Sequence, residues 1–321
     1  MDDRQLLALL AAGPLPAHEL AHRCGTSETA IAERIHELRD DGLAIERSPL
    51  GTYELRAVPQ WLDAQIINQA LTPQAAARLQ QLDVAWEVGS TNSALLEQPA
   101  GAGGDVVLLA ERQTSGRGRR GRAWQSPLGA NVYLSVLHRV DGGLQRAGGL
   151  SLAMGVAVAE ALHALGFTQV QLKWPNDLVV DGRKLGGLLV EGGGEFAGPA
   201  KVVIGLGLNV HMPVQTRTAI TQPWIDLDGL GHSPVSRNAV AAQVVSMLLP
   251  ALAQFDQHGL APFLPRFAQM DALAGQYVRI ERDGVMYEGY AQGVADDGAL
   301  QVVINGAVVA FHAGEVSVRA I

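Results

Sequence analysis

The chain is organised around the stretch Gly116-Arg117-Gly118-Arg119-Arg120-Gly121-Arg122-Ala123-Trp124, in which four arginines alternate with glycines although the protein carries a net charge of −8. Guanidinium forks bind carboxylate and phosphate oxygens, and glycines let backbone N–H groups turn towards an anion. Apolar, β-rich runs at residues 106–110 and 132–136 flank the stretch and have the character of strands. We therefore expect an ordered anion-binding loop. The alternative is a solvated, disordered arginine-glycine tail that binds nucleic acid loosely.

Length and composition limit the classes of protein to which the chain can belong. A length of 321 residues predicts two or three domains with a sizeable core, and the net charge of −8 excludes a global basic field for nucleic acid. The single cysteine, Cys24, excludes an internal disulfide framework and a cysteine-rich metal site. Residues 1–3 lack the charge pattern of a signal peptide, and no apolar run is long enough to cross a bilayer. We expect a soluble, cytoplasmic protein with no membrane partner.

Residues 1–60 have the pattern of a winged helix-turn-helix domain. A first apolar helix ends at Gly13-Pro14, and further helices are expected at 17–24 and at 28–39, the last with Ser27 as its N-cap. Residues 45–55 can form a two-stranded wing. The pattern predicts DNA binding through a helix-turn-helix at about residues 18–37, and the residues predicted to contact DNA are Ser27, Thr29 and Arg34.

The charge of this segment is unusual for DNA binding. The expected recognition helix presents Glu28, Glu33 and Glu37 against Arg34 and Arg39, and residues 1–57 contain no lysine. Phosphate contacts by basic side chains supply much of the affinity for DNA. Weak or absent DNA binding is therefore an open alternative.

The remainder of the chain predicts an α+β protein with two more domains. After a linker at Val58-Pro59, a helix is expected over residues 62–77, and a mixed-sheet domain is expected over residues 65–272. That domain combines alanine-rich helices at 150–165 and 238–258 with β-rich runs at 106–110, 132–136, 169–173, 188–191 and 201–204. Residues 273–321 change to short strands with Asp-Gly and Asn-Gly turns at 283–284, 297–298 and 305–306, which is typical of a small SH3-like β-barrel.

Two motifs place charged side chains beside predicted strands. In Lys173-Trp174-Pro175-Asn176-Asp177 the strand ends at Pro175, so that Asp177 can hold Mg²⁺ or accept a proton. An Asx turn that starts a hairpin is the alternative. In the second motif, Lys184 precedes Gly186, Gly187 and an apolar strand, and its ammonium group lies either at the floor of a site or in an ordinary hairpin.

Two further stretches give weaker signals. Ser90-Thr91-Asn92 precedes a predicted helix, where such groups either cap the helix or bind a polar small molecule. Residues 205–210 resemble part of a dinucleotide fingerprint, but the third glycine and the following helix are missing, so a Rossmann site is not expected. The chain has no Walker A, His-Glu-x-x-His or Ser-His-Asp signature.

Together, these motifs resemble those of the biotin protein ligases in order and spacing, over nearly the whole chain. The resemblance rests on Ser90-Thr91-Asn92, Gln113, the loop 116–122 and the stretches 173–177 and 183–187. With its winged helix, the chain is similar to the bifunctional members of the family, which also repress the biotin operon. The implied reaction forms biotinyl-5′-AMP and pyrophosphate from biotin and MgATP. A lysine of the biotin carboxyl carrier protein of acetyl-CoA carboxylase then takes the biotin and releases AMP.

The resemblance also implies roles for individual residues. The catalytic residues would be Arg117, Arg119, Lys184 and Asp177, with Asp177 tied either to Mg²⁺ or to the acceptor lysine. Biotin and the adenylate would be bound by Ser90, Thr91, Asn92, Gln113, Gly116, Arg117, Gly118, Arg119, Arg122, Trp124, Lys173, Lys184, Gly186 and Trp224. The arginines would offset the repulsion between a carboxylate and a triphosphate. Trp224 belongs to a loop at 211–224 that is expected to order over the nucleotide.

Two features depart from the pattern of the repressors. Glu28, Ala32 and Glu33 stand where repressors carry basic residues, and the wing at 50–53 lacks a lysine. A ligase with a vestigial or altered DNA-binding domain is thus open, as are a lipoate or octanoyl ligase and a ligand-sensing regulator without chemistry. In the family, bound biotinyl-AMP favours a homodimer formed by edge-strand pairing, whose two winged helices bind a two-fold operator.

Overall fold

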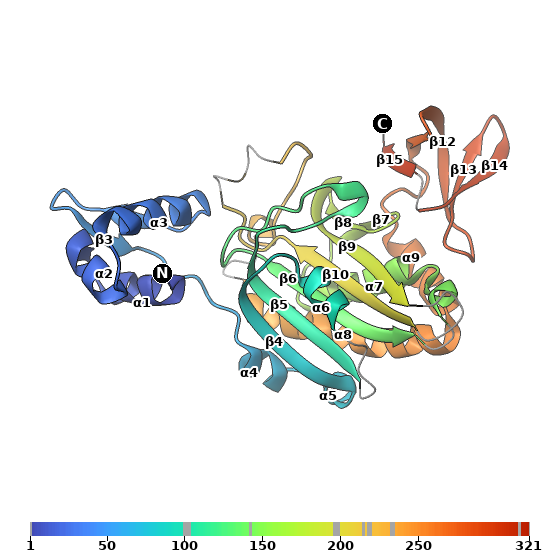
Figure 1. Cartoon of the computed structure of the whole chain (residues 1–321). Coiled ribbons are helices and arrows are strands. Elements are labelled where there is room, and N and C mark those ends of the chain that lie inside the picture. The colour runs from blue at the N-terminus through green and yellow to red at the C-terminus, as the bar shows by residue number, and fades with distance from the viewer. Residues whose placement is uncertain are drawn as a thin grey trace.

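The computed structural model describes residues 2–98, 104–140, 143–194, 200–213, 216, 220–231, 235–313 and 316–320. A linker joins a helical N-terminal region to a large central sheet, and a smaller sheet follows at the C-terminus (Figure 1). The helices are α1 (Asp3–Ala12), α2 (Ala17–Cys24), α3 (Glu28–Asp40), α4 (Ala64–Gln69), α5 (Pro73–Arg78), α6 (Thr91–Glu97), α7 (Leu150–Ala164), α8 (Arg237–His258) and α9 (Leu264–Met270). The strands are β1 (Leu15–Pro16), β2 (Ile45–Arg47), β3 (Thr52–Leu55), β4 (Leu79–Val88), β5 (Asp105–Gln113), β6 (Val132–Val140), β7 (Gln171–Lys173), β8 (Asp177–Val180), β9 (Arg183–Gly194), β10 (Ala200–Leu208), β11 (Tyr277–Arg282), β12 (Val285–Val294), β13 (Leu300–Ile304), β14 (Ala307–Phe311) and β15 (Val316–Ala320).

The N-terminal region consists of α1, α2 and α3 with the three-stranded sheet β1-β3-β2. The expected helices are confirmed. Gly25 ends α2 in the left-handed conformation (φ 64°), and the Ser27 hydroxyl accepts a hydrogen bond from Ala30 N at 3.2 Å to cap α3. Both strands expected within residues 45–55 form as β2 and β3. The two-residue β1, which pairs with β3, was not expected, because so short a strand leaves no pattern in the sequence.

The prediction of one helix over residues 62–77 is wrong. The structure has two helices, α4 and α5, with a turn between them that ends at Thr72. The Thr72 hydroxyl caps α5 by accepting from Ala75 N at 3.4 Å, and Pro73 is the first helical residue. Proline lacks the backbone donor that a continuous helix needs and is favoured at a helix start, so the break follows from Thr72-Pro73.

The central sheet has the strand order β4-β5-β6-β10-β9-β8-β7. β4 and β5 are parallel, and all other neighbours are antiparallel. Each β-rich run expected in this part of the chain overlaps one of these strands, but β4 and β8 were missed. β4 lies at the edge of the sheet and carries exposed polar residues such as Gln80 and Gln81, so it has no continuous apolar run.

The two faces of this sheet are covered differently. One face packs on α7 and α8 in the main core, to which β10 contributes Ile204, Leu206 and Leu208. Val203 points to the opposite face, where it packs with Leu95 of α6. Because side chains alternate along a strand, Gly205 and Gly207 continue the face that carries α6. This second face is where the candidate site lies.

Helix α8 corrects one expectation from the sequence. By length and composition this 22-residue helix is apolar enough to cross a membrane, although no such run was expected. In the structure, 67% of the apolar 18-residue stretch of this helix is buried inside the protein, and α8 packs against α7, α5 and the central sheet. Its apolar composition is thus that of a core helix.

The C-terminal strands form an antiparallel sheet in the order β14-β13-β12-β11-β15. Two of the expected turns have positive φ at both central residues, 52° and 77° at Asp283-Gly284 and 51° and 83° at Asn305-Gly306, as a two-residue type I′ hairpin requires. Gly298 (φ 88°) turns the chain between β12 and β13. The antiparallel arrangement is confirmed, and closure into an SH3-like barrel stays a prediction.

His138 of β6 belongs to a buried ion cluster that ties β5 to α8. Its Nδ1 lies 2.6 Å from Asp105 Oδ1 and its Nε2 lies 3.0 Å from Asp256 Oδ1, while Arg78 Nε donates to Asp105 at 3.1 Å. Burial by itself lowers the pKa of His138. The hydrogen bonds and charges of Asp105 and Asp256 outweigh burial and raise the pKa to about 9.

We predict that His138→Gln destabilises the protein in a pH-dependent manner. The folded pKa of about 9 lies above the unfolded value of 6.5, so the ion pairs stabilise fully below pH 6.5 and this contribution is lost as the pH rises through 9. Urea unfolding near pH 6, 7.5 and 9.5 measures the effect. The variant should lose on the order of 3 kcal/mol at the lowest pH and progressively less towards the highest. An equal loss at all three values would contradict the pairing.

Candidate functional site

A cavity of about 750 Å³ opens on the face of the central sheet that carries α6. Its lining comes from the start of α6, the arginine-glycine loop, the β7–β8 hairpin, β9, β10 and residues 220–224. Thirteen of the fifteen residues predicted for ligand binding or catalysis line it: Ser90, Thr91, Asn92, Gln113, Arg117, Gly118, Arg119, Arg122, Trp124, Lys173, Asp177, Lys184 and Trp224. Segments far apart in the sequence therefore meet where the resemblance predicts a ligand.

The other two predicted residues are glycines that the structure places behind the lining. A Cβ on Gly116 would lie 2.6 Å from the Trp124 carbonyl oxygen. A Cβ on Gly186 would lie 2.8 Å from the Gly207 carbonyl oxygen. Both positions thus allow neighbouring backbone to approach closely and shape the wall from outside.

The arginine-glycine loop is folded back on itself. Trp124 N donates to the Gly116 carbonyl at 2.8 Å, and Gly118 N donates to the Arg122 carbonyl at 2.7 Å. This backbone pairing is that of an ordered loop and not of a disordered tail. Three of the four arginines of the loop, Arg117, Arg119 and Arg122, line the cavity.

Two arginines of the loop have fixed partners. Arg117 Nη2 lies 2.9 Å from Glu191 Oε2, and Arg119 Nη1 donates to Asn176 Oδ1 at 3.0 Å. Arg119 also donates to the backbone carbonyl of Ala313 in the C-terminal region. Burial lowers the pKa of Arg119, but the intrinsic pKa of arginine is so high that the guanidinium stays charged.

A chain of hydrogen bonds orients the polar residues at the start of α6. Gln113 Oε1 accepts from Thr91 N at 2.9 Å and from Thr91 Oγ1 at 3.1 Å. The Ser135 hydroxyl donates to Asn92 Oδ1 at 2.6 Å and also contacts Thr91. Ser90 occupies the cap position of α6, but its side chain makes no cap hydrogen bond. These fixed hydroxyl and amide groups suit a compact ligand with both donors and acceptors.

Lys184 lines the cavity and is mostly buried. Its Nζ is 2.7 Å from Asp177 Oδ1 and 5.4 Å from the centre of the Trp124 ring. Its backbone N–H donates to Pro223 at 2.9 Å and its carbonyl accepts from Ile225 N at 3.0 Å, so the segment that carries Trp224 lies along β9. Of the loop expected over residues 211–224, residues 214–215 and 217–219 lie outside the described part of the chain.

The donor set does not fit a magnesium ion held by the protein. Asp177, the predicted ligand, already faces the Lys184 ammonium group. Among the residues that the structure describes, no three His, Cys, Asp or Glu side chains are grouped closely enough to share a metal. Because Mg²⁺ is usually held by phosphate and water oxygens with one or two carboxylates, it would reach this cavity as part of a nucleotide.

Sequence reasoning missed two glycines that form the floor of the site. The Asn92 side chain lies over Gly205 and the Trp124 ring lies over Gly207, each closer than a Cβ would allow. The signal was present, because glycines inside an apolar strand often mark a close approach to its face. We interpreted them as a partial dinucleotide fingerprint instead, although β10 simply continues through them to Leu208.

Two polar residues of the site were also missed. Glu191 accepts from Asn92 Nδ2 at 2.8 Å in addition to its ion pair with Arg117. Ser135 is fully buried on β6 beneath Thr91 and Asn92. Each is a single polar residue in or at the end of an apolar strand, and nothing in its local sequence shows what it faces.

The residues predicted to contact DNA lie in the N-terminal region, away from the cavity. Ser27 and Thr29 are exposed at the start of α3. Arg34, however, forms ion pairs with Asp3 and Glu37, so its guanidinium is engaged within the protein.

Comparisons with known proteins agree with this geometry. Residues 90–209 match the model of the biotin/lipoate A/B protein ligase family, and residues 274–319 match the biotin protein ligase C-terminal domain. The bifunctional ligase/repressor BirA of Escherichia coli (strain K12) is 38% identical over 316 residues, which cover 98% of this chain and 96% of the relative. The biotin–[acetyl-CoA-carboxylase] ligase of Mycobacterium tuberculosis is 36% identical over 250 residues, or 75% of this chain and 90% of that protein.

A solved structure gives the same result for the fold. The biotin protein ligase from Aquifex aeolicus, in complex with biotin and ATP, superposes with a TM-score of 0.64 at 26% identity. The match covers 75% of this chain and 100% of that chain. The mixed central sheet and the C-terminal antiparallel sheet are therefore those of a biotin ligase fold.

We predict that Gly207→Ala weakens the binding of biotin, the ligand that the resemblance implies. The added methyl group enters the space of the Trp124 ring, and an overpacking cost of about 1–3 kcal/mol borne by the bound state corresponds to roughly 5- to 150-fold in affinity. Titration calorimetry measures the change. Gly193→Ala is the matched control, because its Cβ would meet only the Lys201 side chain at 3.6 Å. Equal affinities of the two variants would contradict the proposed floor.

Proposed function

Because the chain belongs to the biotin protein ligase family, and is thus an ATP-dependent ligase, we propose that it activates biotin and transfers it to the biotin carboxyl carrier protein of acetyl-CoA carboxylase. One observation carries the proposal. Arg117, Arg119 and Lys184 share a cavity with fixed, uncharged hydroxyl and amide groups. The cations suit two anionic reactants, and the uncharged groups suit a ureido ring.

In the first half-reaction, a carboxylate oxygen of biotin attacks the α-phosphorus of ATP, and the bond to the bridging oxygen breaks to release pyrophosphate. Both reactants are anions, so cations must offset their repulsion and the charge that develops at phosphorus. Arg117, Arg119 and Lys184 supply this charge. Their ion pairs and hydrogen bonds hold them in place, so little reorganisation is needed during the reaction. Mg²⁺ enters with the phosphates of its nucleotide substrate.

The remaining lining residues divide between the two parts of biotinyl-AMP. Ser90, Thr91, Asn92 and Gln113 bind the ureido ring of biotin. The Trp124 ring lies near the Lys184 ammonium group and Trp224 pairs with the Lys184 backbone, so both can flank the adenylate, supported by Arg122 and Lys173. Burial lowers the pKa of Lys173, and a nearby anion would favour its charged form.

In the second half-reaction, the amine of the carrier lysine attacks the acyl carbon of the mixed anhydride, and AMP leaves. The amine must give up a proton as the amide forms. Asp177 is a partly exposed carboxylate on the cavity wall, and its Oδ1 faces Lys184. We assign Asp177 to this proton and to the acceptor lysine, because its surroundings do not fit a protein-held Mg²⁺.

A lipoate ligase is the competing enzyme. The matched family model includes both biotin and lipoate ligases, but the match at residues 274–319 is to the C-terminal domain of biotin protein ligases. Pyrophosphate release should therefore require ATP together with biotin. Release with lipoate and not with biotin would replace the proposal by the lipoate alternative.

We predict that Arg117→Ala and Lys184→Ala each reduce the transfer of biotin to a carrier-protein fragment by roughly 10²–10³-fold, the usual cost of losing one donor to a developing charge. Streptavidin blots of timed reactions measure the transfer. Arg183→Ala is the matched control, because Arg183 precedes Lys184 but pairs with exposed Asp181 at 3.5 Å. Full labelling by both cavity variants would refute these roles.

A second function is repression of biotin genes by a winged helix-turn-helix in residues 1–60. The similarity to the bifunctional ligase/repressor covers 98% of the chain, and the described helices α2 and α3 are joined by a short turn at Gly25. We propose that biotinyl-AMP favours a homodimer that presents two such regions to a two-fold operator. β4 is an edge strand of the central sheet, and its outer side is a candidate for pairing with a second copy. The reaction uses ATP and a carrier protein, which agrees with a cytoplasmic location.

Charge predicts how this DNA binding behaves. Residues 1–60 contain ten acidic residues, six arginines and no lysine. Ion pairs with acidic side chains engage Arg23, Arg34 and Arg56. Few cations are thus available to phosphates, and most of the affinity would come from base contacts and from binding as a dimer.

We predict a shallow dependence of operator affinity on salt, with a slope of log K against log salt no steeper than about −3, or about three phosphate contacts. Filter binding across a salt series with biotin and ATP present gives the slope. Leu50→Lys places one cation per protomer at a position 92% exposed between β2 and β3, so the dimer gains two and the slope should steepen by about 2. A wild-type slope of −6 or steeper would contradict the charge argument.

A further inference from the structure

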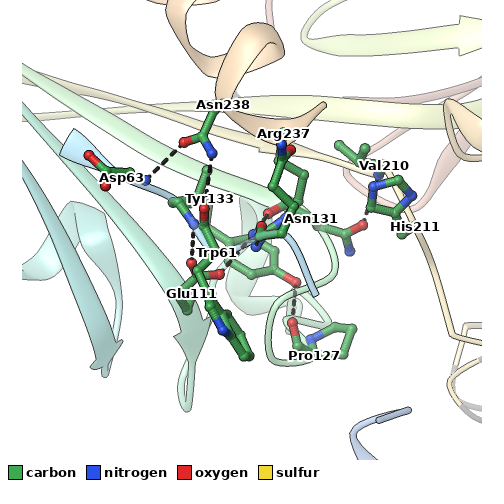
Figure 2. Close-up of polar contacts among 12 residues, drawn as sticks. Trp61, Asp63, Glu111, Pro127, Asn131, Tyr133, Val210, His211, Arg237 and Asn238 are labelled. Carbon is green, nitrogen blue, oxygen red and sulfur yellow. Dashed lines mark hydrogen bonds and ion pairs between the residues drawn. The ribbon is translucent and has the colours of Figure 1, made fainter. Parts of the chain in front are cut away.

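The linker between β3 and α4 is held by buried side chains from elsewhere in the chain. Arg237 donates to the Gln60 carbonyl, and Asn238 Nδ2 donates to the Trp61 carbonyl at 2.9 Å. Leu62 N donates to Glu111, and Asp63 N donates to Asn238 Oδ1 at 2.8 Å. Figure 2 shows Asn238 with Trp61 and Asp63, and Arg237 and Glu111 beside them, at the start of α8. Four successive linker residues thus each give one backbone group to three side chains: Arg237, Asn238 and Glu111.

Burying the three side chains costs free energy, because each loses the water that would solvate its polar or charged groups. Arg237 is 0% exposed, Glu111 1% and Asn238 4%. Arg237 Nη1 lies 2.8 Å from Glu111 Oε2. A buried ion pair of this kind is seldom more stabilising than apolar residues of the same volume, but losing one partner is costly. The pair therefore serves to fix one arrangement of the linker rather than to add stability.

The same arginine reaches the wall of the candidate active site through Asn131. Arg237 Nη1 donates to the Asn131 carbonyl at 3.1 Å. The Asn131 side chain accepts from Val210 N at 2.8 Å through Oδ1, and its Nδ2 contacts the Met212 sulfur (Figure 2 shows Asn131 and Val210). Met212 and Asn209 line the cavity. Buried contacts therefore run without a gap from the linker to the segment that precedes residues 220–224.

The linker end of this network also bears on the N-terminal region. The Trp61 ring lies on Gly129, where a Cβ would be 2.8 Å from it, and packs against Trp86 at an interplanar angle of 54° with ring centres 4.8 Å apart. The guanidinium of Arg4, in α1, lies 5.1 Å from the centre of the Trp86 ring. A change in the hydrogen bonds to residues 60–63 would therefore change the position of α1 through Trp61 and Trp86.

We propose that Arg237, together with Glu111, is a positioning residue. It couples the position of the N-terminal region, set through Trp61 and Trp86, to the conformation of residues 209–212 in the cavity wall. The conformation of the wall and the hydrogen bonds that fix linker residues 60–63 then change together, in one coupled equilibrium. Whatever binds at the wall tightens the linker, and loosening the linker weakens binding by the same factor. Only the identity of the ligand rests on the proposed function; the coupling itself rests on the contacts.

The first test needs no ligand and no activity. Trp61→Gly removes the ring that seats the linker but leaves Arg237, Glu111 and Asn131 intact. In the full-length chain, amide-resolved hydrogen exchange should accelerate at Leu62 and Asp63 and also, by about fivefold or more, at Val210. Val58→Gly is the matched control, since Val58 is 55% exposed in the same linker and should leave Val210 unchanged. Unchanged exchange at Val210 in Trp61→Gly would overturn the coupling, whatever the protein catalyses.

The second test uses biotin and ATP. The double variant Glu111→Leu/Arg237→Met replaces the buried pair by apolar residues of similar volume, which such sites tolerate. We expect the KM for biotin to rise by about tenfold while kcat stays within about twofold. Biotin with ATP should slow exchange at Leu62 and Asp63 in the wild type but not in this variant.

The control for the second test is Glu160→Leu/Arg266→Met, which removes a partly buried ion pair between α7 and α9 that is not part of the network. Equal effects of the two double variants would show a general loss of stability and refute the positioning role. Ligand-dependent protection of the linker that persists in the Glu111/Arg237 variant would refute it as well. Absence of pyrophosphate release by the wild type would instead refute the proposed function, and the exchange test with Trp61→Gly stands independently of that result.

Discussion

The architecture of the site depends on the pairing of its cationic side chains with fixed acceptors. This pairing lets several positive charges surround one cavity without strong mutual repulsion. Like charges in a partly buried space repel strongly because the surroundings screen them poorly. Each of three cations therefore has a fixed partner: Arg117 has Glu191, Lys184 has Asp177, and Arg119 has the Asn176 amide oxygen. The carboxylates belong to β9 and β8, so the sheet itself supplies the balance of charge. The partners also orient the cations, which is what a reaction between two anions requires.

This arrangement needs a sheet face that side chains leave free. On the opposite face, α7 and α8 cover β10 with a continuous apolar core. On the face of the site, Gly205 and Gly207 let Asn92 and the Trp124 ring lie directly on the strand. The start of α6 and the arginine-glycine loop can then converge above β10, close enough for Asn92 to reach Glu191 at 2.8 Å. The alternation of apolar and glycine positions in one strand thus separates the core from the site.

Sequence patterns predicted the features whose cause is local. Charge density indicated the loop, periodicity indicated the helices, and Asp-Gly and Asn-Gly pairs indicated the C-terminal turns. Features with a distant cause were missed. Ser135 and Glu191 gain their roles from residues more than forty positions away, and a polar edge strand such as β4 forms because β5 offers it a partner. The break at Thr72-Pro73 was a local signal that we overlooked because the apolar pattern runs through it.

The linker network attaches the N-terminal region to the rest of the chain in a defined position, which bears on how the region could bind DNA. Regions joined by solvated linkers with few contacts normally move relative to each other. Here the backbone of residues 60–63 is paired with buried side chains, so the region is attached in a defined position. An acidic DNA-binding element gains little from phosphates, but in the proposed dimer two rigidly attached copies would lose little further freedom when they bind two half-sites together. A fixed linker can therefore supply, through geometry, affinity that the acidic surface of α3 does not.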